Sequence, residues 1–404
     1  MRALVLSATL PVVSERDQQG VMHRLRLYID AMASLTPDIH IAHIAPASAA
    51  EVPAPELARR QAAFWGRDVQ VSVIHRAPIP GGFRGHYLDG LADAGRQRNF
   101  RPFADPGPVA EVAALLTEIR PDLVLAHRLP AMAALLRSGQ APRRVFFDLD
   151  DVEHMVQWRQ ATTRPLRPGK ALELLKVPAI LAEERRAARF AKLTFVCSEK
   201  DERYLGRWVG PGRVACVPNA LPMPDQPPGV ASEPTLGFIG AMHHPPNVEA
   251  VERLARRILP LVRREVPEAR LLIAGTGSEK LPGLDLPGVE VLGFVPEVAG
   301  FHARTRLACA PLVNGGGTRL KLIEAAAHAR PMVSTVLGAE GLRFEPEREI
   351  LLRDDDAGFA EACVFLLRDD AACARLGEAA RRRALDCYSA AAASSRIAGL
   401  LEAG

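Results

Sequence analysis

Three consecutive glycines and the run that follows them form the segment with the clearest chemical potential in the chain. Gly315, Gly316 and Gly317 stand directly before an amphipathic run that opens with Thr318. Glycines allow backbone N–H groups to come close to a ligand. A helix that begins just after them points its free N–H groups and the positive end of its dipole at the same place. The pattern therefore predicts a phosphate-binding site.

Two charged residues of this run extend the prediction from phosphate to nucleotide. Lys321 and Glu324 are three residues apart and share one face of the expected helix. The cation suits a phosphate group, and the carboxylate suits the hydroxyl groups of a sugar. A glycine-rich turn that caps an ordinary helix is the alternative, but the ordered combination with Lys321 and Glu324 favours the nucleotide site.

The size and composition predict a soluble globular protein. The chain has 404 residues, of which 48% are hydrophobic and 5% aromatic, and this length suggests two or three domains. No apolar run reaches the roughly 18 residues that a membrane span needs. Residues 1–6 are too short an apolar stretch for a signal peptide and are typical of a first strand. None of the six cysteines forms a CxxC pair, which indicates a reducing cytoplasm and neither a disulfide framework nor a zinc site.

The net charge of +4 is too small to indicate a nucleic-acid partner. Basic residues exceed acidic ones in residues 1–228, which suggests peripheral contact with the inner face of the membrane or an anionic acceptor. Scattered arginines on a solvated surface are the alternative explanation.

Short β-rich runs alternate with helical ones, which predicts an α/β protein with parallel sheets. We expect an N-terminal domain over residues 1–228 and a second over 234–387, with a proline-rich linker between them and a C-terminal helix over 388–404 that packs on the first. Two doubly wound, Rossmann-like domains that face a central cleft are the simplest architecture. Strands are expected at 3–9, 39–45, 69–75, 123–126, 145–149, 193–197, 214–217, 236–239, 271–274, 289–293, 307–310, 332–335 and 350–352, and the clearest helices at 20–34, 109–119, 171–191 and 248–264.

Several of these segments together resemble the family-4-type retaining glycosyltransferases (glycosyl transferases group 1), which have the GT-B fold. The resemblance covers most of the chain and is densest in its second half. It rests on residues 237–240 with Pro246 and Asn247, and on 269–275, 289–295, 311–327, and 331–335 with 338–342. It implies that the second domain binds a nucleotide-sugar.

The resemblance also implies roles for residues of the second domain. Glu324 would hold the ribose hydroxyls, and Lys321 with Arg319 would neutralise the diphosphate as it leaves. Phe294 and Val295 would border the base. The remaining phosphate-binding residues would be Gly240, Asn314, Gly315, Gly316, Gly317 and Thr318.

Two departures from the family pattern are visible. The family has two glutamates separated by seven residues; Glu324 fits the second, but the first position is Gly316. The loop over residues 241–246 lacks the Arg and Lys of many relatives, so Arg319 and Lys321 are the nearest cations for the phosphates. Asn314 or the amides of Gly316 and Gly317 would then replace the sugar contact of the first glutamate.

The first domain carries the expected acceptor side. His127 ends a strand that, in this family, delivers a histidine to the donor sugar or acceptor, and we expect it to be catalytic together with Lys321 and Glu324. A buried structural histidine is the alternative. The other residues expected on this side are Gly20, Arg24, Arg128, Asp150 and Asp151, although loop capping explains the two aspartates equally well.

The implied reaction moves a hexose-like group from a nucleoside diphosphate to a hydroxyl acceptor with retention of anomeric configuration. The acceptor would be a glycan, as in polysaccharide biosynthesis, a lipid-linked glycan or a small molecule. The resemblance implies no cofactor and no essential metal, because cationic side chains and helix dipoles serve in this fold. A non-catalytic nucleotide-binding scaffold and a UDP-sugar epimerase are the alternatives; the missing first glutamate motivates the scaffold, and the intact segment from Gly315 to Glu324 opposes it.

Overall fold

The computed structural model describes residues 1–9, 20–45, 54–79, 90–162, 168–315 and 318–404. The chain forms two compact units, which we call unit 1 (Met1–Pro218 with Ala391–Gly404) and unit 2 (Asn219–Ala390). The change of unit between Pro218 and Asn219 lies ten residues before the expected end of the first domain at 228. The segment between the last strand of unit 1 and the first strand of unit 2 contains neither helix nor strand, as its prolines favour.

Unit 1 is built on a seven-stranded sheet in which every strand pair is parallel. Its strand order is β3-β2-β1-β4-β5-β6-β7. The central strands β4 and β5 are buried along their whole length, as expected for strands covered on both faces. The strands are β1 (Arg2–Ser7), β2 (Asp38–Ala45), β3 (Gln70–His75), β4 (Leu123–His127), β5 (Val145–Asp150), β6 (Leu193–Val196) and β7 (Val214–Cys216).

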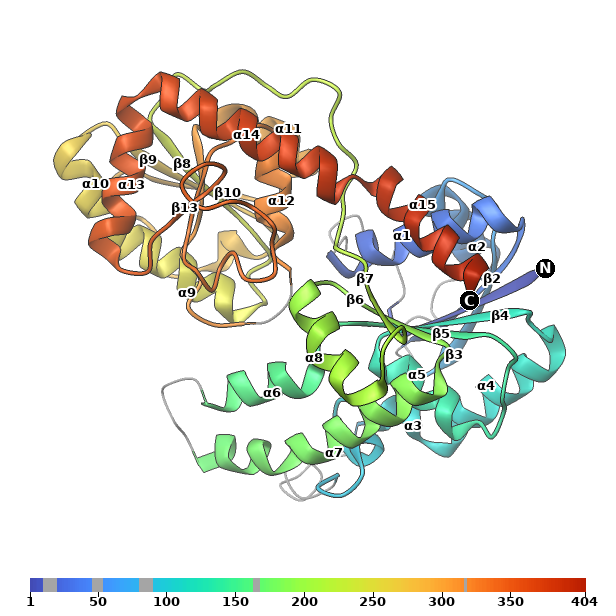
Figure 1. Cartoon of the computed structure of the whole chain (residues 1–404). Coiled ribbons are helices and arrows are strands. Elements are labelled where there is room, and N and C mark those ends of the chain that lie inside the picture. The colour runs from blue at the N-terminus through green and yellow to red at the C-terminus, as the bar shows by residue number, and fades with distance from the viewer. Residues whose placement is uncertain (10–19, 46–53, 80–89, 163–167, 316–317) are drawn as a thin grey trace. The chain divides into compact units, whose positions relative to one another are not determined.

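Helices cover both faces of this sheet (Figure 1). α4 (Pro106–Ile119), α5 (Leu129–Arg137), α7 (Pro168–Phe190) and α8 (Glu199–Val209) share one core with alternate residues of the strands. On the other face, α1 (Gly20–Leu35) packs Tyr28 against Phe195 of β6, and the C-terminal α15 (Ala390–Ala403) accepts a hydrogen bond from Arg144 at the carbonyl of Leu401. The remaining helices are α2 (Ala54–Trp65), α3 (Arg101–Ala104) and α6 (Glu153–Thr162).

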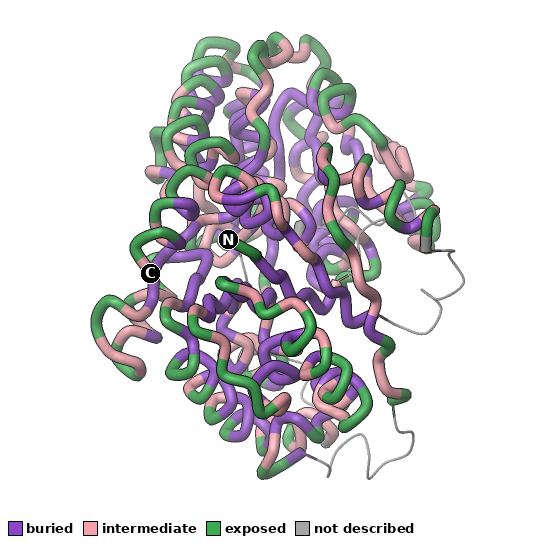
Figure 2. Tube along the Cα trace, turned by 90° about the vertical axis from the view of Figure 1, so that its right-hand side faces the viewer, coloured by how far each residue is buried: buried purple, intermediate pink, exposed green. Residues whose placement is uncertain are grey.

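Unit 2 contains a second parallel sheet, of six strands in the order β10-β9-β8-β11-β12-β13. Figure 2 shows buried segments in the interior and more exposed segments around them. The expected strands of the second half are confirmed to within about two residues. They are β8 (Thr235–Ile239), β9 (Arg270–Ala274), β10 (Val289–Gly293), β11 (Leu307–Ala310), β12 (Met332–Ser334) and β13 (Leu351–Leu352).

The two faces of this sheet are again covered by different helices. α9 (Pro245–Arg253), α10 (Leu259–Glu265) and α13 (Asp356–Arg368) share a core with Leu271 and Ile273 of β9. α11 (Val298–Arg304) packs Phe301 against Leu272 and Ala274 on the opposite face, where α12 (Leu320–Ala327) and α14 (Asp370–Tyr388) also contribute apolar residues.

Two helical predictions for unit 2 need correction. The helix expected over 248–264 begins at Pro245 and passes through a π-helical segment, Leu254–Ile258, before α10. Pro260, the second residue of α10, has no N–H to continue the α-helical ladder, which accounts for the change. The helix expected to open at Thr318 begins at Leu320, with Arg319 as its N-terminal cap.

In each sheet the first three strands are added in one direction and the later strands in the opposite direction, so the winding reverses at one point. In unit 1 this point lies between β1 and β4, and in unit 2 between β8 and β11. Ligands of open α/β sheets bind outside the carboxyl ends of the strands at this point. The strand order therefore directs attention to the residues after β1, β4, β8 and β11.

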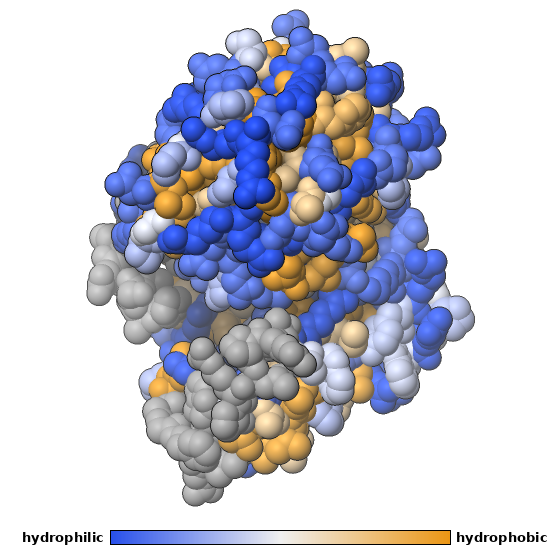
Figure 3. All heavy atoms as spheres, turned by 90° about the vertical axis from the view of Figure 1, so that its left-hand side faces the viewer, coloured by the Kyte–Doolittle hydropathy of each residue, from blue (hydrophilic) through white to orange (hydrophobic). Residues whose placement is uncertain are grey.

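Figure 3 shows hydrophilic residues over much of the face it presents, with smaller apolar patches between them. Among the helices of the described residues, none has the length and apolar character that crossing a bilayer requires. The six cysteines all lie in the described part of the chain, and none of them is in a disulfide there.

Candidate functional site

In unit 2, two glycines allow the ends of β8 and β9 to approach each other. Gly275 has φ +124°, and a Cβ there would collide with the carbonyl oxygen of Gly240. The N–H of Gly240 donates to the carbonyl of Ala274 at 3.0 Å. A Cβ at Gly240 would lie 2.8 Å from Nδ2 of Asn247 and 2.9 Å from Nζ of Lys321. The predicted site residue Gly240 thus leaves room for two polar side chains.

Lys321, near the start of α12, is held by groups from two other elements. Its Nζ donates to Oδ1 of Asn247 at 2.8 Å, and Nδ2 of Asn247 donates to the carbonyl of Ala241 at 2.8 Å. The same Nζ lies 3.8 Å from the centre of the Phe238 ring, within cation–π range. Residues from β8, α9 and α12 therefore fix one amine at the end of β8.

Positive groups converge around this amine. Burial lowers the pKa of Lys321 well below its usual value, and the charge of Arg319 lowers it further while Glu324 opposes the change. The pKa of His244 is lowered by burial and then by the charges of Arg319 and Lys321. Repulsion between the charges of Arg319 and Lys321, at the start of α12, is relieved when an anion binds between them. The predicted cation Arg319 is thus close to Lys321, whose amine lies beside Gly240.

The other residues predicted to bind phosphate have different surroundings from one another. Gly315 has φ +102° and a Cβ there would lie 3.2 Å from Cγ of Pro246, so it is close to α9. The side-chain amide of Asn314 donates to Glu249. The hydroxyl of Thr318 is buried and has no hydrogen-bond partner among the described residues. Gly316 and Gly317 lie outside the described residues.

Glu324 lies near α11, the helix that follows β10 and the base-side residues. Its side chain is 22% exposed, on the same helix as Lys321, and its Oε2 lies 4.0 Å from Nε2 of His302. Phe294 and Val295 follow β10 and are half-buried. Val295 packs against the cluster that contains Phe301 of α11.

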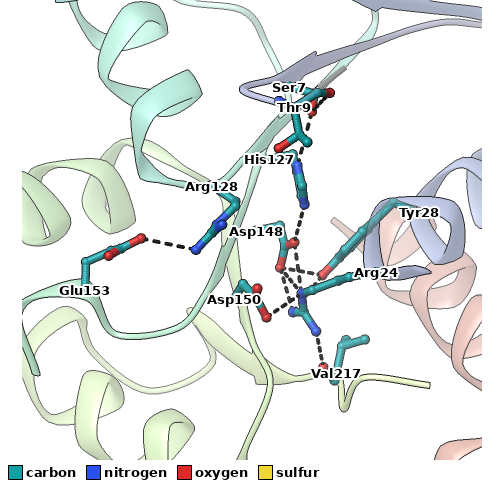
Figure 4. Close-up of polar contacts among 10 residues, drawn as sticks. All are labelled: Ser7, Thr9, Arg24, Tyr28, His127, Arg128, Asp148, Asp150, Glu153 and Val217. Carbon is teal, nitrogen blue, oxygen red and sulfur yellow. Dashed lines mark hydrogen bonds and ion pairs between the residues drawn. The ribbon is translucent and has the colours of Figure 1, made fainter. Parts of the chain in front are cut away.

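In unit 1, polar residues form a row across the carboxyl ends of four neighbouring strands. Ser7 is in register with His43 on one side and His127 on the other, and His127 is in register with Asp148. All four residues are completely buried. Nδ1 of His127 lies 3.3 Å from Oγ of Ser7, and its Nε2 lies 3.7 Å from Oδ2 of Asp148 (Figure 4). Burial, then the charge of Arg128, lowers the pKa of His127 to about 3, so the imidazole is neutral.

Arg24 of α1 is engaged by protein groups rather than turned to solvent. Its guanidinium donates to both carboxylate oxygens of Asp148 and, at 2.8 Å, to the carbonyl of Val217. The hydroxyl of Tyr28 donates to the same carboxylate at 2.9 Å. Figure 4 shows these groups converging on Asp148. The placement of Arg24 therefore indicates that it positions Asp148, and the acceptor contact expected of it stays a prediction without support from this geometry.

Arg128, which follows β4, and Asp150, which ends β5, have strained backbones. Their φ angles are +71° and +63°, a region that non-glycine residues rarely adopt and that is often found at functional sites. The side chain of Arg128 is 28% exposed and turns to Glu153, 3.5 Å away (Figure 4). Asp150 pairs with Nε of Arg24 at 3.2 Å. Burial and the charge of Asp150 raise the pKa of the neighbouring Asp151 to about 7.

Asp150 and Asp151 also lie near a thiol. One ligand atom each of Asp150, Asp151 and Cys197 falls within 4.8 Å of the others, a spacing that a metal ion can use. Arg24 and Arg128, however, already offer positive charge to these carboxylates. Gly20, also expected on this side, is the first residue of α1.

The structure adds residues to which the sequence assigned no role. Ser7 and His43 are at strand ends in register with His127, and this could be inferred only once the strand order was known. Asn247 lies 74 positions before Lys321, and His302 lies 22 positions before Glu324. Neither spacing is that of a local motif, so the sequence carried no signal for these contacts.

Comparison with known proteins finds a family match within unit 2. Residues 233–369 match the family model described as Glycosyl transferases group 1. A stretch of 155 residues is 34% identical to phosphatidyl-myo-inositol mannosyltransferase of Mycobacterium leprae (strain TN). That match covers 35% of this chain and 41% of the relative, so it spans less than half of either protein.

Solved structures resemble the chain over its whole length. Sucrose-phosphate synthase from Thermosynechococcus elongatus superposes with a TM-score of 0.70 over 99% of this chain and 98% of its own, at 17% identity. Anabaena HepE in complex with UDP and glucose gives 0.67 over 100% of both chains, at 14% identity. At these identities the likeness concerns the fold, and it confirms the prediction of two parallel-sheet α/β domains of the GT-B type. Family-4 membership and the retaining stereochemistry stay predictions.

Proposed function

We propose that this chain, whose residues 233–369 match the glycosyl transferases group 1, transfers a sugar from a nucleoside-diphosphate sugar to a hydroxyl acceptor with retention of configuration. One observation carries the donor assignment. Nζ of Lys321 lies beside Gly240 at the winding reversal of unit 2, is held there by Asn247, and is close enough to Arg319 for the two charges to repel, which favours an anion between them. Glu324 on the same helix supplies a carboxylate for the ribose hydroxyls.

The diphosphate is the leaving group of this reaction. As the anomeric C–O bond breaks, negative charge develops on the phosphate oxygens, and Lys321 and Arg319 stabilise it from fixed positions. The amide groups of Gly315, Gly316, Gly317 and Thr318, the Thr318 hydroxyl and Asn314 complete the phosphate site in this proposal. Phe294 and Val295 border the base. The acceptor hydroxyl attacks the anomeric carbon from the face that the leaving group vacates and passes its proton to an oxygen of the departing diphosphate, which gives retention without a protein nucleophile.

Unit 1 binds the acceptor in this proposal. His127, Arg128, Asp150 and Asp151 lie at or just after the ends of β4 and β5. Asp151, with a pKa of about 7, both donates and accepts hydrogen bonds to hydroxyl groups near neutral pH. The mannosyltransferase relative is named for a phosphatidyl-inositol substrate, which supports a lipid-linked or polysaccharide acceptor. Such an acceptor would place the protein peripherally at a membrane.

We also propose that the reaction uses no essential metal or other cofactor. Two cationic side chains already serve the phosphates, and a third positive group is close to them when His244 is protonated. Turnover measured with and without EDTA tests this point, and loss of activity that Mg²⁺ restores would overturn it.

The test of the donor site is turnover with mass-resolved products from a panel of UDP-, GDP- and ADP-sugars. We expect Lys321→Ala and Glu324→Ala each to weaken nucleotide binding and lower the rate by about tenfold or more, since each removes a charge-assisted contact. Lys280→Ala and Glu252→Ala, which alter exposed residues of unit 2, serve as matched controls. Nucleotide titrations that are unchanged in both site variants would defeat the assignment.

The same experiment separates the two alternatives. Binding of a nucleotide-sugar without transfer or hydrolysis would favour the non-catalytic scaffold. A changed sugar on the released nucleotide would favour the epimerase.

A further inference from the structure

His302 is a completely buried imidazole whose two ring nitrogens have no hydrogen-bond partner among the described residues. It lies on α11, which follows β10 and the base-side residues. Leaving a buried polar atom unpaired costs free energy, so such an atom is expected to find a partner in the working state of the protein. The nearby carboxylate of Glu324 is a suitable partner, with its Oε2 4.0 Å from Nε2 of His302.

The residues around His302 leave its imidazole ring little room to move except toward Glu324. One face of its ring stacks on His328 with centroids 4.5 Å apart and an interplanar angle of 20°. The Phe301 ring meets it nearly at a right angle, 5.3 Å away. His328 is itself fixed, because its Nδ1 lies 2.9 Å from the carbonyl oxygen of Glu324, to which it can only donate.

Glu324, by contrast, is held loosely. Its side chain is 22% exposed, and its carboxylate reaches no protein donor at hydrogen-bond distance among the described contacts. A carboxylate that receives two ribose hydroxyls must keep one orientation, and fixing a free carboxylate costs side-chain entropy. A movement of about 1 Å would bring Oε2 within hydrogen-bond distance of Nε2–H of His302.

We propose that His302 is a positioning residue that donates its Nε2–H to Glu324 and thereby orients this carboxylate toward the 2′- and 3′-hydroxyls of a bound ribose. Phe301 and His302 are adjacent on α11, and Phe301 packs in the cluster that also includes Val295. α11 therefore connects the proposed base pocket to the proposed ribose contact. The inference rests on the proposed donor site, because it assigns a role to one residue behind that site.

The experiment measures nucleotide affinity and its dependence on the ribose hydroxyls. UDP, GDP and ADP are titrated calorimetrically, and the one that binds most tightly is compared with its 2′,3′-dideoxy analogue. We expect His302→Leu to weaken binding of the ribonucleotide by about tenfold, as for the loss of a hydrogen bond to a charged group. Binding of the dideoxy analogue should change less than twofold, because Glu324 has no hydroxyls to hold there.

Matched amide variants separate positioning from packing. In His302→Gln the amide N–H reaches about as far as Nε2 and should restore most of the affinity. His302→Asn carries the same group on a shorter side chain and should not. In a Glu324→Ala background, His302→Leu should have no further effect on nucleotide affinity. Thermal unfolding of each variant identifies any that fails to fold. If His302→Leu fails to fold, the comparison of His302→Gln with His302→Asn tests the positioning role.

The outcomes distinguish this inference from the proposed function. If the wild-type protein binds none of the three nucleotides, both are overturned. If it binds one of them but His302→Leu weakens the ribonucleotide and the dideoxy analogue equally, the positioning role is wrong and the donor site stands. Additive losses in the Glu324→Ala background would also overturn the role of His302.

Discussion

At the scale of single residues, the amine of Lys321 gives the proposed donor site a distinctive pH dependence. Burial and the charge of Arg319 lower the pKa of Lys321 in the unliganded protein. A phosphate group binds the ammonium form, so binding raises this pKa again. At pH values above the lowered pKa, nucleotide binding must therefore take up a proton.

We accordingly predict that nucleotide affinity falls as pH rises past this lowered pKa, by up to about tenfold per pH unit. Calorimetry in buffers of different ionisation heat should show proton uptake on binding. Lys321→Arg, which stays charged, should abolish both the uptake and the decline, whereas Lys280→Ala should preserve them. An affinity that is flat with pH in the wild type would show that the amine is charged before the nucleotide arrives.

Two neighbouring glycines should respond differently to the same substitution. In Gly240→Ala the new Cβ meets the movable ends of Asn247 and Lys321, so we predict a folded protein with weaker nucleotide binding. In Gly275→Ala the new Cβ meets the backbone of Gly240, and the φ of +124° at position 275 is unfavourable for alanine. We therefore predict a loss of about 1–3 kcal/mol in the free energy of unfolding.

Chemical denaturation and nucleotide titration of both variants check this contrast. Gly300→Ala is the control, because a Cβ in that helix meets no atom within 4 Å. It should be neutral or slightly stabilising. Equal stability losses in Gly240→Ala and Gly275→Ala would contradict the distinction between side-chain and backbone neighbours.

The sequence could group only those proposed site residues that lie in one short segment. Lys321 and Glu324 were placed on one helical face because three residues separate them, and the structure confirms that they share α12. Asn247 and His302 contact these residues through the fold, and no local pattern records such contacts. The burial of Arg24 was missed for the same reason, since Asp148 is 124 positions away.

At the scale of elements, one buried ion pair joins α1 to β5. Arg24 and Asp148 are both fully buried, and Tyr28 and Val217 complete their hydrogen bonds. Removing one partner of such a pair leaves an uncompensated buried charge. We predict that Asp148→Asn lowers the free energy of unfolding by about 3–5 kcal/mol.

The control for this prediction is the exposed pair of Arg59 and Glu56 on α2. Arg59→Ala should change stability by less than about 1 kcal/mol, because water screens such pairs. Urea denaturation followed by circular dichroism measures both variants. If Asp148→Asn changed the free energy of unfolding as little as the control does, the hydrogen-bond network around Arg24 and Asp148 would not stabilise the fold of unit 1.

Strands were easier to predict than helix boundaries. Buried parallel strands are short, nearly continuous apolar runs, and β4, β5 and β9 stand out for this reason. Helix ends depend on capping and on distant packing; α12 begins two residues later than expected, with Arg319 rather than Thr318 before it. α5 was not among the clearest helices expected, and all its residues except Pro130 and Arg137 are buried, so its sequence is apolar along nearly its whole length.

At the scale of the whole molecule, the two units share one topological plan. Each sheet has the order 3-2-1-4-5-6 in its own strands, with one further strand in unit 1, and each reverses beside its first strand. The proposed donor residues in unit 2 and the polar row in unit 1 both lie at this reversal. The alternation of strands and helices predicted the plan, but only the strand order showed that the two groups of residues occupy equivalent positions.

The chain returns to unit 1 after completing unit 2, and this connection yields a test of the whole architecture. Residues 391–404 belong to unit 1, where Ile397 and Leu401 are fully buried and the carbonyl of Leu401 accepts a hydrogen bond from Arg144. Burying two such side chains contributes roughly 3–6 kcal/mol. We predict that deletion of residues 391–404 destabilises unit 1 selectively.

Calorimetry with and without UDP, or whichever nucleotide binds, measures this selectivity. At 100 times its dissociation constant the nucleotide should stabilise unit 2 by about 2.7 kcal/mol in both the full chain and the truncated one. Only the transition that the nucleotide does not shift should move down on truncation. Leu401→Ala should reproduce part of that loss, about 2–5 kcal/mol, while Leu385→Ala, at an exposed position of α14, should not. A truncated chain that loses nucleotide binding as well would show that the stability of unit 2 depends on the C-terminal helix, contrary to the division of the chain into two units.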